Sequence, residues 1–129
     1  MTETETLRYA RNILLKLHKS LIDFERTAYE GIHGRLNAGQ FLNVLLEDRN
    51  FAWLRKFSIL IVEIDEMFDL KDGISAEMVS SNLQKIRDLT AMRLDDEDFC
   101  SRYQNALQHD VDAAATQAQL HALLSGPPA

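Results

Sequence analysis

Three polar side chains, Arg11, His18 and Glu25, follow one another at seven-residue intervals near the start of the chain. At about 100° per residue they form one seam along a helix, between two apolar stripes. An imidazole and a carboxylate in such a partly buried seam could bind a ligand or act as a general base. Asp65, at the edge of another apolar helical face, is the expected partner of His18 from outside this helix. The candidate small-molecule or metal-binding residues are therefore His18, Glu25, Asp65 and Arg11.

A structural role competes with this chemistry, because a histidine between apolar stripes is usually a hydrogen-bonded core residue. On one straight helix His18 and Glu25 stand about 10 Å apart, so they cannot share a metal ion unless other helices intervene. The pair Glu30-x-x-His33 has the spacing of di-iron bundles, but no second Glu-x-x-His pair occurs in the sequence. We assign no metal ligand, no cofactor and no catalytic residue.

Composition predicts one globular domain spanning residues 1–129. The chain is 46% apolar and 26% charged, which is ordinary for a folded protein. Its net charge of −6 argues against nucleic-acid binding. The sequence shows neither a signal peptide nor an apolar run of about 20 residues, so we expect no membrane association. Cys100 is the single cysteine, which favours the reducing cytoplasm.

Apolar residues at alternating three- and four-residue steps predict helices that must position these side chains. The first helix is expected over about 5–30, with Thr4 or Thr6 at its start and Gly31 and Gly34 at its end. Further helices are expected over about 38–47 after Asn37, 51–68, 76–94 after Ser75, from 95–98 onward, and 113–124. The segment 126–128, Gly-Pro-Pro, is expected to end the chain. Short loops between these helices predict an all-α, compact antiparallel bundle of four longer helices and one or two short ones.

The first helix has more apolar surface than one packing face needs. One stripe comprises Leu7, Ala10, Leu14, Leu17, Leu21, Phe24 and Ala28. A second stripe, at sevens, comprises Leu15, Ile22 and Tyr29. Helices of the same domain could cover this second stripe, or it could meet its own copy in a homodimer or receive a partner protein.

Three segments carry a resemblance to known proteins. They are 17–26 (LHKSLIDFER), 51–55 (FAWLR) with 64–66 (IDE), and 99–108 (FCSRYQNALQ). Together they resemble a group of small, uncharacterised bacterial helical proteins. The resemblance implies a bacterial source and a self-contained domain, and it implies no activity and no site residues.

The leading functional hypothesis is therefore a non-enzymatic protein-interaction or regulatory module, homodimeric through the first helix. Its motivation is the second stripe of Leu15, Ile22 and Tyr29. The alternative is a small-molecule or metal-binding bundle that uses the seam around His18.

Overall fold

The computed structural model describes residues 1–125, and all of its regular structure within that range is helical. The predicted end of the chain at 126–128 lies outside the described residues. The elements are α1 (Glu3–His33), α2 (Ala38–Glu47), η1 (Arg49–Leu54), α3 (Arg55–Phe68), α4 (Ala76–Thr90), α5 (Glu97–His109) and α6 (Val111–Leu124). The predicted all-α bundle is confirmed.

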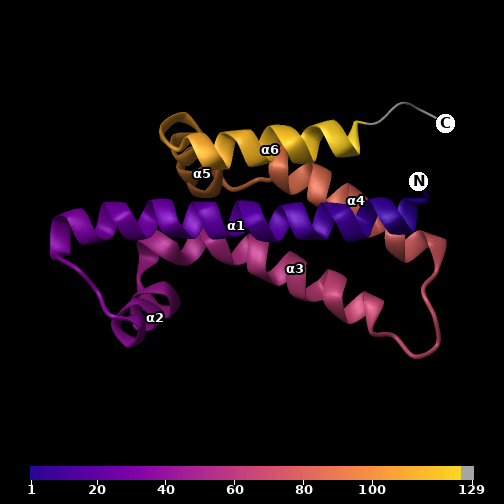
Figure 1. Cartoon of the computed structure of the whole chain (residues 1–129), viewed down its shortest axis with the longest axis horizontal. Helices are drawn as coiled ribbons and strands as arrows, with labels where there is room; N and C mark the ends of the chain where they lie inside the picture. The colour runs from indigo at the N-terminus through magenta and orange to yellow at the C-terminus, as the bar shows by residue number, and fades with distance from the viewer. Residues whose placement is uncertain (126–129) are drawn as a thin grey trace.

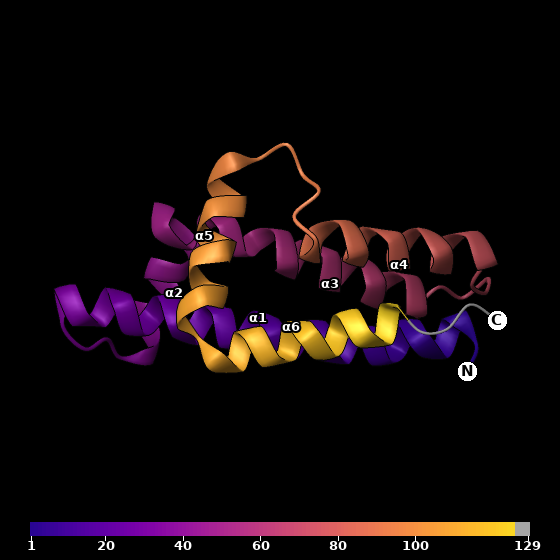
Figure 2. The same cartoon turned by 90° about the horizontal axis from the view of Figure 1, so that it is seen from above.

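Helix α1 is the central rod, and α3, α4 and α6 pack along it (Figure 1). Helix α3 runs opposite to α1, α4 returns alongside α3, and α6 again runs opposite to α1, which makes the bundle antiparallel. Helix α5 crosses the long axis of the bundle, whereas α6 lies along α1 (Figure 2). Because α1 has neighbours on several sides, it needs the wide apolar arc that its sequence carries.

Cap residues set both ends of α1. The hydroxyl of Thr2 accepts a hydrogen bond from the backbone N–H of Glu5 at 3.1 Å, and Gly34 ends the helix at a φ of +90°. The predicted start at Thr4 or Thr6 and the predicted stop at Gly31 are both wrong. Gly31 lies inside the helix, because a glycine weakens a helix without ending it. Of these two glycines, Gly34 is the one with the positive φ that glycine favours.

The segment 49–54 is a 3-10 helix, so the prediction of one α-helix over 51–68 is wrong at its start. The carboxylate of Asp48 accepts a hydrogen bond from the backbone N–H of Asn50 at 2.8 Å and begins this tight turn. Side chains three residues apart eclipse one another in a 3-10 helix, so Phe51 and Leu54 both enter the core. The Ile- and Val-rich stretch 57–64 is helical, as predicted.

Helix α4 begins after its predicted cap Ser75 but ends at Thr90 rather than near Leu94. Two backbone hydrogen bonds end it: Met92 N–H to the Leu89 carbonyl at 3.2 Å, and Arg93 N–H to the Asp88 carbonyl at 2.9 Å. This is a Schellman ending, with Met92 at a φ of +58° where glycine is usual. The missing glycine is why the sequence did not reveal this end.

The last two helices start at aspartates. The Asp96 side chain accepts from the Phe99 backbone N–H at 3.0 Å and caps α5, and Asp110 accepts from Ala113 at 2.9 Å and caps α6. Capping by Asp110 starts α6 at Val111, two residues before the predicted start. The acidic cluster predicted for the first turn of α5 thus supplies its cap and its first two residues.

An aromatic cluster of Trp53, Phe57, Phe99 and Tyr103 forms the middle of the core. Ring centroids within it lie 5.2 to 6.3 Å apart. The Tyr103 hydroxyl donates to the side chain of Gln117, which ties α5 to α6. Burial raises the pKa of Tyr103, so this phenol stays neutral. The cluster packs η1, α3 and α5 against one another.

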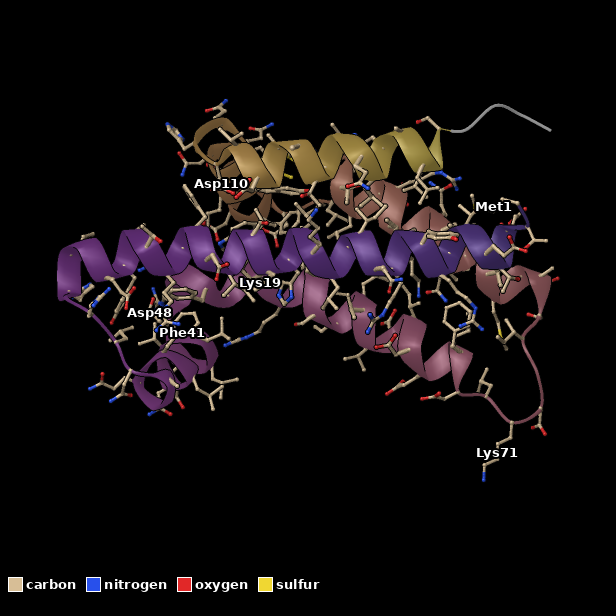
Figure 3. The ribbon with its side chains drawn as sticks, in the orientation of Figure 1. Met1, Lys19, Phe41, Asp48, Lys71 and Asp110 are labelled. Atoms are coloured by element: carbon tan, nitrogen blue, oxygen red, sulfur yellow. The ribbon has the colours of Figure 1, made fainter. Side chains whose placement is uncertain are left out.

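Helix α2 has its predicted bounds, and the reciprocal hydrogen bonds of Asn37 and Gln40 cap its start. Leu42 and Leu46 are exposed, so only part of the apolar surface of α2 packs inward. Phe41 lies between α2 and α1 (Figure 3), with the Arg26 guanidinium 4.3 Å from its ring centroid. None of the helices described in residues 1–125 is both long and apolar enough to cross a membrane.

Candidate functional site

Arg11 and Asp65 form a bidentate ion pair between α1 and α3. Arg11 Nε lies 2.8 Å from Asp65 Oδ1, and an η nitrogen of the same guanidinium lies 2.8 Å from Oδ2. The hydrogen bond and the opposite charge lower the pKa of Asp65 and raise that of Arg11. Asp65 therefore contacts the polar seam from α3, and it does so through Arg11 and not through His18. The two charges satisfy each other within the fold, and both side chains stay partly exposed.

His18 is a half-buried residue whose ring lies against the aromatic core. Its ring stacks on Phe57 with centroids 6.1 Å apart and an interplanar angle of 16°. Burial lowers the pKa of His18, so the imidazole is neutral at neutral pH. Contact with an aromatic core residue is what a packing role requires, and the geometry favours that role for His18.

Glu25 is half-buried beside η1 and α5, two turns beyond His18. Burial raises its pKa, and the Arg102 guanidinium and the Trp53 indole N–H oppose that rise. Trp53 Nε1 is itself buried and has no hydrogen-bond partner in the described part of the chain, so the indole and carboxylate face each other without a completed bond. The fold therefore leaves the Glu25 carboxylate without a completed hydrogen bond.

The seam does not form one site. Its three residues stay about 10 Å apart along α1, and each meets a different neighbour: Asp65, Phe57 or the Trp53–Arg102 region. Across residues 1–125, no three His, Cys, Asp or Glu side chains gather closely enough to hold a metal ion. The structure thus brings together Arg11 with Asp65 but not His18 with either carboxylate.

The second stripe of α1 is covered unevenly. Leu15 is 43% exposed, whereas Ile22 and Tyr29 are half-buried against the core. The Tyr29 ring meets Phe51 edge-on at 5.8 Å, so η1 supplies much of its cover. Two of the three predicted interface residues thus have neighbours within the same chain.

A groove that sequence reasoning missed runs between α3 and α4. It consists of two adjoining hollows of about 360 and 400 Å³, which share Glu63 and Lys85. Lys85 Nζ lies 3.3 Å from Glu63 Oε2, so an ion pair spans the groove at its middle. Its apolar lining comprises Ile59, Leu60, Leu89 and Leu94 on one side of this pair and Met67, Leu70 and Met78 on the other.

Part of this groove could have been recognised from the sequence. Ile59 lies roughly 140° around α3 from the buried stripe, so it is apolar without a place in the core. Met78 is adjacent to the buried Val79 on α4 but is 40% exposed, so helical periodicity alone does not place it in the groove. Leu70 follows the end of α3, where helical periodicity gives no guidance.

Comparison with protein families, with curated proteins and with solved structures gives no match to this chain, so the resemblance to bacterial helical proteins stays a prediction.

Proposed function

We propose that this chain is a non-enzymatic protein-interaction or regulatory module, which binds an amphipathic helix of a partner protein in the α3–α4 groove. The observation that carries the proposal is the row of exposed apolar side chains Ile59, Leu70 and Met78 along one groove. Partner helices lay their apolar faces into grooves of this kind. Met78 suits such a surface, because its flexible side chain adapts to the helix it meets, and the buried Met67 lies beside it in the groove lining.

The length of the groove agrees with a helical partner. Ile59 and Met67, both on α3, are eight residues apart, so these lining residues span about 12 Å along the helix. A partner helix covers that distance in about two turns, with apolar anchors at positions i, i+4 and i+7 or i+8. An open channel of this shape suits a polypeptide better than a small reactant, which would be left in contact with solvent.

Charge at the edges of the groove favours a basic partner. Glu63, Glu66 and Asp88 line it together with Lys56 and Lys85. Both lysines are already paired, Lys85 with Glu63 and Lys56 with Asp96 at 3.3 Å. Within residues 1–125, Glu66 has no ion pair, and the whole chain carries a net charge of −6. The partner helix therefore carries lysine or arginine beside its apolar face.

We propose, second to the groove, that two copies of the chain associate through α1, which would also make it a protein-interaction module. Leu15 is its exposed residue, and in an isologous contact it would meet Leu15 of the other copy. Sedimentation at micromolar concentration tests this arrangement, and a chain that stays monomeric throughout contradicts it. The cytoplasm is the proposed location of the module, because a single cysteine is typical of proteins in reducing compartments.

The groove is tested with a designed helical peptide and methyl-labelled methionine. The peptide presents leucines at i, i+4 and i+7 and lysines on both flanks, and its comparison peptide replaces the lysines by glutamates. Of the chain's four methionines, Met67 and Met78 line the groove, whereas Met1 and Met92 do not. We expect saturable methyl shifts at Met67 and Met78 with the basic peptide, and weaker ones with the acidic peptide.

A matched pair of variants controls this test. Ile59→Lys places a charge in the groove and should abolish the shifts. Val62→Lys changes an equally apolar residue of α3, 53% exposed against 58% for Ile59, that does not line the groove. Equal loss in both variants, or no shift with either peptide, contradicts the proposal. Concentration-dependent Met67 and Met78 shifts without peptide would instead show that a second copy occupies the groove, and would overturn the partner helix.

A further inference from the structure

A small polar pocket lies where the last turns of α1 meet η1, on surfaces separate from the α3–α4 groove. It has a volume of about 210 Å³ and is lined by Glu25, Ala28, Tyr29, Ile32, His33 and Asn50. Most of these residues come from consecutive turns of one helix, and Asn50 approaches from η1. The pocket therefore combines a carboxylate, two rings and an amide within a small volume.

The carboxylate in this pocket has no counter-ion of its own. Among residues 1–125, Glu25 forms neither a salt bridge nor a hydrogen bond, and the residues one turn away on α1 are uncharged: Leu21, Ile22, Ala28 and Tyr29. The nearby Arg102 is engaged elsewhere. Its Nε lies 3.0 and 3.1 Å from the two Asp98 carboxylate oxygens, and an η nitrogen lies 3.3 Å from Asn50 Oδ1. A half-buried carboxylate without a partner is costly, so a cation that entered the pocket would be bound favourably.

The Tyr29 ring beside Glu25 adds a second attraction for a cation. Tyr29 and His33 lie with ring centroids 4.3 Å apart at 33°, and Phe51 holds Tyr29 from the other side at 5.8 Å. The face of an aromatic ring attracts a cation and also packs against an alkyl chain. The Asn50 amide closes the pocket on the side of η1, and its oxygen already accepts a hydrogen bond from Arg102.

We propose that this pocket binds a small organic cation with a primary ammonium group, Glu25 serving as its counter-ion and Tyr29 packing against its alkyl part. The volume is below that of pockets for drug-sized molecules, so the ligand is a short alkylamine or a molecule of similar size. The buried Trp53 indole lies beside this carboxylate but forms no completed hydrogen bond with it. This ligand site neither needs nor excludes the partner helix in the α3–α4 groove.

The test uses n-butylammonium chloride as the probe and Trp53 as the reporter. Trp53 is the only tryptophan of the chain and lies next to Glu25, so its fluorescence should respond when the carboxylate gains a counter-ion. We expect a saturable change with n-butylammonium and none with n-butanol or potassium chloride. A matching response to n-butanol, or no saturable response up to about 10 mM probe, overturns the proposal.

Variants separate the carboxylate from general charge effects. Glu25→Gln should weaken binding by about tenfold or more, whereas Glu47→Gln, at an exposed position at the end of α2, should leave it unchanged. Unchanged affinity in Glu25→Gln would contradict the assignment. If that variant does not fold, Tyr29→Leu tests the same pocket, because loss of the ring should weaken binding about threefold, and full retention of affinity would overturn the role of Tyr29. The methyl shifts of Met67 and Met78 should not respond to this probe.

Discussion

Two apolar surfaces of this chain differ in what lies over them. The second stripe of α1 begins at the exposed Leu15 and continues into Ile22 and Tyr29, which pack against the core. In the α3–α4 groove, by contrast, Ile59, Leu70 and Met78 all stay exposed. The two surfaces have similar composition, so composition alone does not separate core from contact surface. The difference is that α1 is central and receives neighbours on several sides, whereas the outer sides of α3 and α4 face solvent.

The largest expected effect separates two adjacent leucines of α1. Leu14 is fully buried and Leu15 is 43% exposed. Leu14→Ala should lower the free energy of unfolding by about 2–5 kcal/mol, because it leaves a cavity in the core. Leu15→Ala should change it by no more than about 0.5 kcal/mol, as at other surface positions. Urea denaturation measures both, and a large loss at Leu15 would mean that another chain covers this residue in solution.

An intermediate effect is expected at the covered end of the same stripe. Tyr29→Ala removes a half-buried ring that contacts Phe51 and His33. We expect a loss of about 1–2 kcal/mol in unfolding free energy, below the 3–5 kcal/mol typical of a fully buried aromatic residue. Thermal denaturation monitored by circular dichroism provides the measurement. A cost as small as that of Leu15→Ala would show that the stripe is open along its whole length, and the contrast with the groove would disappear.

The smallest expected effect concerns the ion pair that joins α1 to α3 beside these surfaces. Arg11→Ala, Asp65→Ala and the double variant should give a coupling energy of about 0.2–1 kcal/mol, because both side chains are partly exposed. Arg11 lowers the pKa of Asp65, so the stabilisation is present above the ordinary aspartate pKa and is lost as pH falls through the lower folded-state pKa. Urea denaturation across acid pH measures this. Coupling that grows on acidification would show that Arg11 is not the group that stabilises the charged carboxylate.

Much of the fold could be predicted because it depends on local pattern. The bounds of α2, the cap at Ser75 and the helical state of 57–64 follow from capping residues and periodicity. The errors occur where local signals are weak. Met92 ends α4 without a glycine, and the 3-10 helix η1 depends on how its side chains meet the core. Sequence reasoning has no means of weighing such tertiary contacts against α-helical propensity.

The candidate site residues show the same division. The seam of Arg11, His18 and Glu25 follows from seven-residue spacing on one helix, but Asp65 pairs with Arg11 and not with His18, its expected partner. Which seam residue Asp65 meets was not predictable, because it depends on how far α3 is shifted along α1. The groove between α3 and α4 joins residues that are separated by a loop, so no sequence pattern places them side by side.

The amino-acid sequence by itself determined that this chain is helical, roughly where its helices lie, and that its first helix needs cover on more than one side. These features depend on interactions between residues a few positions apart, which a sequence displays directly. Tertiary structure decided that Arg11 pairs with Asp65, that His18 packs on Phe57, and that α3 and α4 leave an apolar groove. Each of these depends on the relative shift and rotation of two packed helices, which arise from the fit of all the side chains between them.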